Sequence, residues 1–249
     1  NSQNLAQNGG FETGHFTGWM FVGKGSDLGL IYNAVLDTTQ FNSFGYLLVT
    51  HSGRCGVLLG DNQVATLSQT ISTLPGHSYL VSFWLNNFTN GTFQMFKVNW
   101  LDSNNGSNNS LYSIENPPAF TWTKHQFLTQ ATSATTTLQI QAENDSGYFG
   151  LDDISVMPVP NPTLQQISMT SPSQITNQPS AAFANGVQLS WEATPGISYQ
   201  IQYKTNLLQP DWINLGTPFV ATTNVVSLLD TNDAGSSAQR YYRFSFHGP

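Results

Sequence analysis

Residues 79–86 read Tyr-Leu-Val-Ser-Phe-Trp-Leu-Asn, and this stretch decides the fold class. In an extended chain, one face of it carries Tyr79, Val81, Phe83 and Leu85. The other face carries Leu80, Ser82, Trp84 and Asn86. This two-residue period is typical of a β-strand, and no segment of the chain sustains the 3.6-residue apolar period of a helix. The sequence therefore predicts an all-β protein.

Similar strand-like runs recur along the chain, separated by turn-forming clusters such as residues 75–77 and 102–109. In the first part they are residues 44–49, 55–59, 66–71, 78–86, 92–101, 121–129, 135–142 and 148–156. In the second part they are residues 164–169, 187–193, 198–204, 212–215, 225–229 and 239–246. The first set predicts a jelly-roll β-sandwich, and the second, shorter set predicts an immunoglobulin-like β-sandwich.

One proline-rich segment separates the two sets of strands. Residues 157–162 read Met-Pro-Val-Pro-Asn-Pro, and prolines this close together disfavour both helix and ladder pairing. We therefore predict a first domain over residues 1–157, a stiff linker over 158–163 and a second domain over 164–249.

The composition narrows the range of partners. Charged residues make up 8% of the chain, against about 25% in ordinary soluble domains. The formal net charge is −7, and ten of the fourteen acidic side chains lie in residues 1–160. Nucleic acid and anionic membrane surfaces are therefore poor partners, because no basic patch can displace counterions from phosphates. Neutral polysaccharides, or cations such as calcium, suit this charge balance better.

The single cysteine, Cys55, excludes an internal disulfide and a cysteine-rich zinc site. No apolar stretch of about 18 residues is present, so we predict no membrane insertion. The chain begins at Asn1 without a charged and apolar leader. It is therefore either a cytosolic protein or the mature form after signal cleavage. The low charge and the many Asn, Gln, Ser and Thr residues favour a secreted or cell-surface bacterial protein.

Three blocks of the first domain carry a family resemblance. Residues 8–14 read Asn-Gly-Gly-Phe-Glu-Thr-Gly and are followed by Gly18-Trp19. Residues 67–71 read Leu-Ser-Gln-Thr-Ile, with Pro-Gly-His-Ser-Tyr at 75–79 and Ser-Phe-Trp at 82–84. Residues 151–156 read Leu-Asp-Asp-Ile-Ser-Val. Their order and spacing across nearly all of residues 4–156 resemble the carbohydrate-binding modules of families 4, 9 and 22, which implies a galactose-binding-like jelly roll.

The resemblance also implies a structural calcium ion. It would place Glu12 and Asp153 as side-chain ligands and Gly10 as a carbonyl donor, and calcium prefers six to eight such oxygens. Strand alternation turns Asp152 and Asp153 to opposite faces, so we expect only one of them to point at the ion. The alternative is that these acids are ordinary strand-end and turn residues.

The second domain resembles the fibronectin type III-like modules of bacterial secreted proteins. The resemblance rests on Leu-Ser-Trp at residues 189–191, Pro-Gly-Ile-Ser-Tyr-Gln-Ile-Gln-Tyr at 195–203 and Arg-Tyr-Tyr-Arg-Phe at 240–244. An interior Trp and a Tyr on a late strand can fill such a core without a disulfide. It implies a spacer or docking domain that could contact other domains or surface proteins.

The alternation of side chains along the predicted strands also predicts a glycan-binding surface. If the strands at 79–86, 96–101 and 138–141 adjoin in one sheet, their solvent faces share a set of amides, one lysine and one indole. These residues are Trp84, Asn86, Lys97, Asn99, Gln139 and Gln141. An indole stacks on the C–H groups of a sugar while amides bond its hydroxyls. The alternative for Trp84 is packing beneath a loop.

Catalytic patterns are scarce. Glycoside hydrolysis needs two carboxyl groups across a cleft, and Glu143 with Asp145 is the only nearby pair in its part of the chain, in a turn-like setting. We therefore predict a non-catalytic glycan-binding protein whose partner is a polysaccharide or cell-surface glycan. Two alternatives remain open: a cell-surface or matrix adhesion protein without sugar affinity, and a hydrolase or lyase that uses Glu143 or Asp145.

Overall fold

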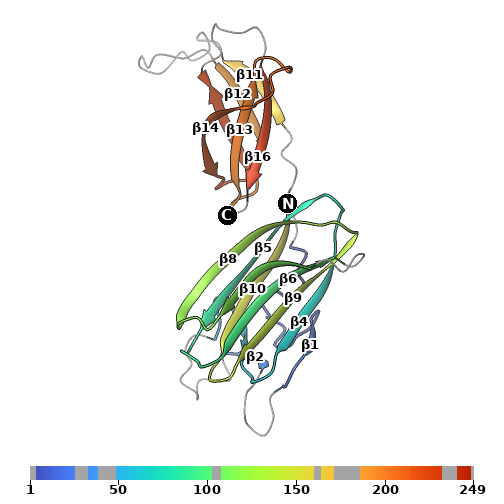
Figure 1. Ribbon diagram of the computed structural model, residues 1–249, viewed down its shortest axis with the longest axis vertical. Helices are drawn as coiled ribbons and strands as arrows, with labels where there is room; N and C mark the ends of the chain where they lie inside the picture. The colour runs from blue at the N-terminus through green and yellow to red at the C-terminus, as the bar shows by residue number, and fades with distance from the viewer. Residues whose placement is uncertain are drawn as a thin grey trace. The chain divides into compact units, whose positions relative to one another are not determined.

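The computed structural model describes residues 4–25, 33–38, 49–102, 108–159, 164–170, 186–231 and 240–247, with the backbone alone for 164–170 and 247 (Figure 1). The chain divides into two compact units, Asn1–Val159 and Pro160–Pro249. Every element in the described ranges is a β-strand, which confirms the all-β class. No helix in these ranges is long and apolar enough to cross a membrane.

The described residues of the first unit form ten strands. They are β1 (Met20–Val22), β2 (Asn33–Asp37), β3 (Cys55–Leu59), β4 (Ala65–Ser72), β5 (Ser78–Asn87), β6 (Gln94–Asp102), β7 (Asn108–Glu115), β8 (Phe120–Gln130), β9 (Thr135–Asn144) and β10 (Phe149–Val159).

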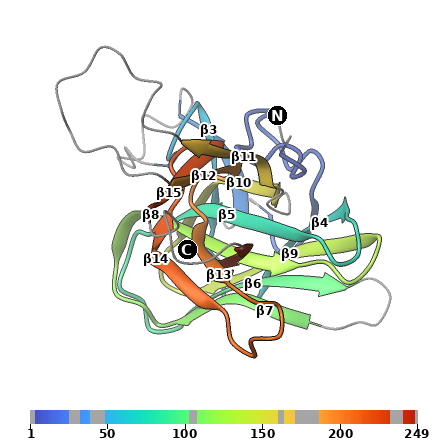
Figure 2. The same cartoon turned by 90° about the horizontal axis from the view of Figure 1, so that it is seen from above.

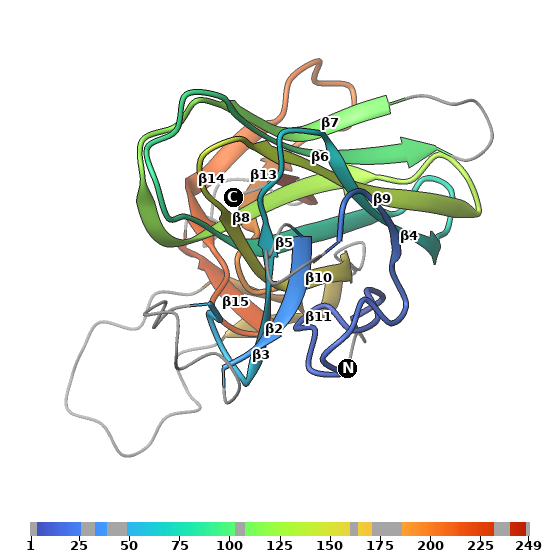
Figure 3. The same ribbon diagram turned by 90° about the horizontal axis from the view of Figure 1, so that it is seen from below.

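These strands form two five-stranded antiparallel sheets. Sheet I has the order β1-β4-β9-β6-β7, and sheet II has the order β2-β3-β10-β5-β8. Figures 2 and 3 show the two sheets as stacked layers. From β3 to β6 each strand crosses to the opposite sheet, and the chain crosses again at each step from β7 to β10. This alternation between two packed sheets is the topology of a jelly roll.

The core lies between the sheets, because each strand turns its apolar alternate residues inward. Sheet II contributes Val81, Phe83 and Leu85 of β5, and sheet I contributes Phe96, Val98 and Trp100 of β6, all at most 3% exposed. Trp100 is thus a core residue.

The second unit is a smaller sandwich. Its strands are β11 (Leu164–Thr170), β12 (Gly186–Glu192), β13 (Ser198–Lys204), β14 (Ile213–Val220), β15 (Val225–Asp230) and β16 (Tyr241–His247). Sheet III has the order β11-β12-β15, and sheet IV has the order β14-β13-β16. Trp191 of sheet III is fully buried and contacts the rings of Tyr199, Phe219 and Phe244 of sheet IV. The predicted interior Trp therefore joins the two sheets.

Three strands of the first unit were not predicted. β1 and β2 are short, and β7 begins in Asn108-Asn109-Ser110, which has turn composition but pairs with β6. The predicted strand at 44–49 lies, apart from Val49, outside the described residues.

The predicted start of the linker is also wrong. Pro158 and Val159 belong to β10, where they pair with Tyr79 and Ser78. β3 pairs with β10 only at residues 149–151, so Pro158 interrupts no ladder with β3.

Candidate functional site

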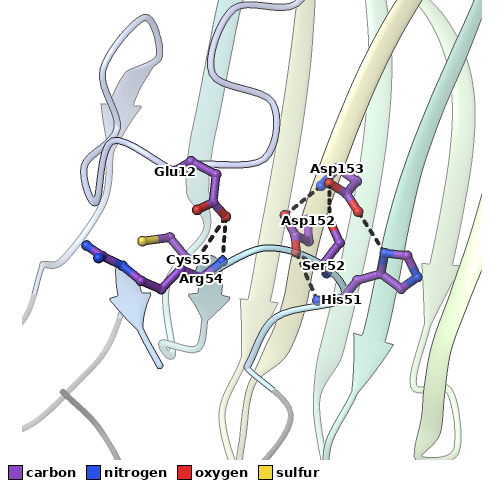
Figure 4. A network of polar contacts seen from close by, with 7 residues as sticks. All are labelled: Glu12, His51, Ser52, Arg54, Cys55, Asp152 and Asp153. Carbon is purple, nitrogen blue, oxygen red and sulfur yellow. Dashed lines mark hydrogen bonds and ion pairs between the residues drawn. The ribbon is translucent and has the colours of Figure 1, made fainter. Parts of the chain in front are cut away.

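Three acidic side chains of the first unit bind the loop before β3, and we call Glu12, Asp152 and Asp153 the acidic cluster (Figure 4). A β-carbon built on Gly10 would lie 3.4 Å from Asp153 Oδ1, 3.9 Å from Asp152 Oδ1 and 3.9 Å from Glu12 Cγ. Gly10, in the N-terminal segment, therefore packs close to β10. The loop that leads into β3 completes the group through His51, Ser52, Arg54 and Cys55.

A β-bulge in β10 turns the side chains of Asp152 and Asp153 toward the same loop, the one that leads into β3. The register between β10 and β5 shifts between Asp152 and Ser155, and Asp153 has a φ of 50°. A bulge inserts one extra residue and breaks the strict alternation of faces. Asp152 and Asp153 consequently both bind His51 and Ser52. The expectation that only one of them would face this side is wrong.

Asp152 is a fully buried acceptor. Its Oδ2 accepts the backbone N–H groups of His51 at 2.9 Å and Ser52 at 3.2 Å, and its Oδ1 accepts the N–H of Asp153 at 2.7 Å. Burial, reinforced by the charge of Asp153, raises the pKa of Asp152 to about 6 against the opposing effect of these N–H groups. The carboxyl group therefore connects the loop to β10 by hydrogen bonds, although burial disfavours its charged form.

Asp153 is partly exposed and holds two side chains. Its Oδ2 lies 2.7 Å from His51 Nδ1, and its Oδ1 accepts the hydroxyl of Ser52 at 2.9 Å. The His51 imidazole in turn stacks on the indole of Trp84, with ring centroids 3.6 Å apart. It also meets the ring of Trp122 edge-on at 6.1 Å. Asp153 thus fixes an imidazole on the outer face of sheet II.

Glu12 binds the other end of the same loop. Its Oε1 accepts the backbone N–H groups of Arg54 at 2.9 Å and Cys55 at 3.0 Å. Gly53 has a φ of 62°, and a β-carbon there would lie 2.2 Å from Glu12 Oε1. Cys55 is fully buried, and burial, followed by the charges of Glu12 and Asp37, raises the pKa of its thiol. This agrees with a packed rather than nucleophilic cysteine.

The donors around Gly10 are oxygens, which suit calcium. As arranged, the carboxylate oxygens accept N–H and O–H groups of the loop at residues 51–55. Within the described part of the chain, no group of three or more His, Cys, Asp and Glu side chains is placed to hold a metal ion. The donor chemistry therefore fits calcium, but these side chains do not form a ready ligand set.

The six predicted glycan-contacting residues divide between two sheets. Trp84 and Asn86 lie on β5 in sheet II, whereas Lys97 and Asn99 of β6 and the two glutamines of β9 lie in sheet I. The predicted single surface is therefore wrong. The condition that these strands adjoin fails, because the connection between β5 and β6 crosses from sheet II to sheet I.

Trp84 is half-buried, whereas Asn86 is buried. One face of the Trp84 indole is stacked on His51, which is the loop packing considered as an alternative. Asn86 is 3% exposed, and its Oδ1 has no hydrogen-bond partner within the described ranges.

The remaining four residues form a continuous patch on the solvent side of sheet I, which we call the amide face: Lys97, Asn99, Gln139 and Gln141. Lys97 lies opposite Gln141 and Asn99 lies opposite Gln139. Asn99 Nδ2 donates to Gln139 Oε1 at 3.3 Å and to Gln141 Oε1 at 3.4 Å. Lys97 Nζ lies 3.5 Å from the carboxylate of Glu115. Asn99 is buried by its neighbours, and the other three are half-buried.

The acidic pair considered for catalysis lies at the end of β9. Asp145 is exposed and Glu143 is half-buried. Burial raises the pKa of Glu143, and the charges of Asp145 and Asp61 add to the effect.

Sequence reasoning missed His51, Ser52 and the role of Asp152. No local spacing marks His51 as a site residue, because its partner Asp153 is 102 residues away along the chain. The available signal was the polar segment His-Ser-Gly-Arg at 51–54, directly before an apolar strand.

No protein-family model and no curated protein sequence matches the chain. Some solved structures resemble the chain at low sequence identity. A family 61 carbohydrate-binding module in complex with β-1,4-galactotriose is 21% identical, with 63% of this chain and 99% of that one covered and a TM-score of 0.47. A family 16 carbohydrate-binding module is 18% identical, with coverages of 61% and 99% and a TM-score of 0.43.

A third structure spans more of the chain. The N-terminal CBM22-1–CBM22-2 tandem domain of Paenibacillus barcinonensis Xyn10C is 10% identical, with coverages of 99% and 83% and a TM-score of 0.43. Because each of these TM-scores is below 0.5 and each identity is below 25%, the likenesses are weak. The fold and the function of this chain rest on its own residues.

Proposed function

We propose that the first unit is a non-catalytic module that binds a neutral polysaccharide through the amide face. The observation that carries the proposal is the row of hydrogen-bonding side chains across adjacent strands. Thr66 of β4 lies opposite Gln141, which lies opposite Lys97, and Ser68, Gln139 and Asn99 form a parallel row. Amides and hydroxyls both donate and accept, as sugar hydroxyls do. The family resemblance of the first domain supports the same function.

Affinity electrophoresis against a panel of neutral polysaccharides tests this proposal. We expect retardation of the wild-type protein by at least one glycan, and loss of retardation in the double variant Gln139→Ala/Gln141→Ala. Gln126→Ala provides a matched control, because Gln126 is a half-buried amide on β8 of the opposite sheet. Retardation that survives the double variant would move the site away from the amide face. No retardation by any glycan would favour an adhesion role without sugar affinity.

Calcium at the acidic cluster is a second part of the proposal. Glu12, Asp153 and the carbonyl of Gly10 would hold the ion, with Asp152 added because the bulge turns it to the same side. Support comes from the carboxylates of Asp152 and Asp153 beside Gly10, whose mutual repulsion a divalent cation would offset. A ligand that binds only the native state raises its melting temperature. We therefore expect a higher melting temperature in calcium than in chelator, and equal values would count against the site.

Two further assignments complete the proposal. The second unit serves as a fibronectin type III-like spacer or docking domain, supported by its two three-stranded sheets around Trp191. The protein acts outside the cell or at its surface, supported by its low charge. Fractionation of the source cells into cytosol, surface and medium tests the location.

A further inference from the structure

The solvent side of sheet IV in the second unit carries two cations and an indole. Tyr199 of β13 points into the core against Trp191, so Gln202 and Lys204 point outward by strand alternation. Arg243 of β16 lies opposite Gln202 in the register, and Asn214 of β14 lies opposite Gln202 on its other side. Arg243, Gln202 and Asn214 therefore form one row across the three strands.

Arg243 is held in a fixed orientation at the end of this row. Its Nε donates to Gln202 Oε1 at 2.7 Å, and Gln202 Nε2 donates to Asn214 Oδ1 at 2.7 Å. Its guanidinium carbon lies 4.6 Å from the centroid of the Trp212 ring. Arg243 is exposed, and within the described ranges its Nη1 and Nη2 atoms have no protein acceptor. Their N–H groups form a planar fork that is oriented before any ligand arrives.

A second positive charge lies on the same ring. Lys204 Nζ lies 5.0 Å from the Trp212 centroid and donates to the backbone carbonyls of Gln209 and Pro210. Lys204 is 7% exposed, so its charge is fixed in place. In the described part of the chain, neither cation pairs with a carboxylate, and the neighbouring Asp211 forms no ion pair with them. Two uncompensated cations thus flank one half-buried indole in a protein of net charge −7.

We propose that Arg243, Trp212 and Gln202 form a binding site for a carboxylated sugar, the uronate unit of an acidic polysaccharide. A guanidinium fork matches a carboxylate with two parallel hydrogen bonds. The indole holds the guanidinium in place through its contact with Arg243, and the amides of Gln202 and Asn214 offer partners for the hydroxyls of the sugar. An acidic peptide would use the fork but not this combination. The site goes beyond the function proposed above, since it lies in the other unit and takes an anionic ligand.

Isothermal titration of the full chain with oligogalacturonate tests the site. We expect measurable binding by the wild-type protein and a loss of about tenfold or more in Arg243→Gln, the effect of losing a charged hydrogen-bonding pair. Arg243→Lys keeps the charge but not the fork and should also weaken binding. Lys124→Gln is the control, because Lys124 is an exposed cation on β8 of the first unit, and it should bind as the wild type does.

Three outcomes would overturn the proposal: no binding of oligogalacturonate, equal affinity in wild type and Arg243→Gln, or equally tight binding of polyglutamate. Circular dichroism checks that each variant is folded, and Trp212→Phe provides a second, apolar variant that leaves Arg243 in place and should weaken binding. Binding of neutral glycans depends on the amide face instead. Failure of that binding while oligogalacturonate binds would contradict the proposed function and leave this site intact.

Discussion

At the scale of single residues, the loop at 51–54 and the start of β3 are held by carboxylates in addition to strand pairing. Glu12 accepts two backbone N–H groups at one end, and Asp152 accepts two at the other. Each N–H that loses its partner in a buried place costs about 1–3 kcal/mol. The loop conformation therefore depends on a few acceptors and on the glycines that make room for them.

Gly53 provides the clearest residue-scale prediction. Gly53→Ala introduces strain at a positive φ, which costs about 1–3 kcal/mol. The new methyl group would also displace Glu12 Oε1 from the N–H groups of Arg54 and Cys55. Gly76→Ala is the control, because Gly76 has a φ of 79° but nothing within 4 Å of an added β-carbon. Urea unfolding should show a larger loss for Gly53→Ala, and equal losses would contradict the role of Glu12.

His125 gives a pH-dependent prediction. Its ring stacks on Phe83 at 5.3 Å and meets Tyr112 at 4.5 Å, and burial lowers its pKa from the ordinary value of 6.5. Below pH 6.5 the unfolded state therefore binds more protons at His125, so the contribution of His125 to the free energy of unfolding falls as the pH falls, opposite in sign to that of Asp152. His125→Phe keeps a ring and removes this contribution. Unfolding measured between pH 5 and pH 8, a range of about three units around the histidine pKa, should show a shallower decline in the variant. Identical slopes would rule out His125 as the source.

At the scale of elements, the bulge in β10 decides where the acidic side chains point. It turns Asp152 and Asp153 to the loop before β3, where a regular strand would have separated them. The bulge also leaves Ile154 free to return to the core, where it is 2% exposed. One extra residue thus serves both the core and the polar cluster.

Hydrogen exchange can test this element. In Asp152→Ala the N–H groups of His51 and Ser52 lose their acceptor, so we expect their exchange to accelerate. The amide of Val57, within the ladder of β3, should keep its protection and serves as the internal control. Unchanged protection at His51 and Ser52 would mean that the loop is held by other contacts.

Strand periodicity predicted most elements because alternation is local. Residues 55–59 and 198–204 are strands with the predicted bounds, and the predicted inner faces of β5 and β6 are buried. Which strands pair with one another could not be predicted in this way, because pairing depends on contacts between distant parts of the chain. Trp84 and Lys97 lie 13 positions apart in sequence, yet they belong to different sheets. The bulge at Asp152 likewise depends on contacts with residues about 100 positions away. Sequence therefore indicated the candidate residues but not which of them meet.

At the scale of the whole molecule, charge and polar groups are distributed differently over the two units. The first unit carries ten of the fourteen acidic side chains, and its amide face is mostly neutral. The second unit places Lys204 and Arg243 on one side of sheet IV. Anionic chains should therefore avoid the first unit, whereas neutral chains have no electrostatic reason to prefer the second. Together the units would recognise two chemically different kinds of polysaccharide.

Salt dependence should separate the two kinds of binding, if both proposals hold. Attraction between exposed charges is screened as the Debye length falls from about 10 Å at 0.1 M salt to about 3 Å at 1 M. Hydrogen bonds between amides and neutral sugars carry no net charge, so salt affects them little. We therefore expect the Kd for oligogalacturonate to rise steeply between these two salt concentrations, while the Kd for a neutral glycan stays nearly constant. In Arg243→Gln the residual oligogalacturonate binding should lose most of its salt dependence. Equal salt slopes for both ligands would mean that the carboxylate contributes nothing and that the same neutral surface binds them both.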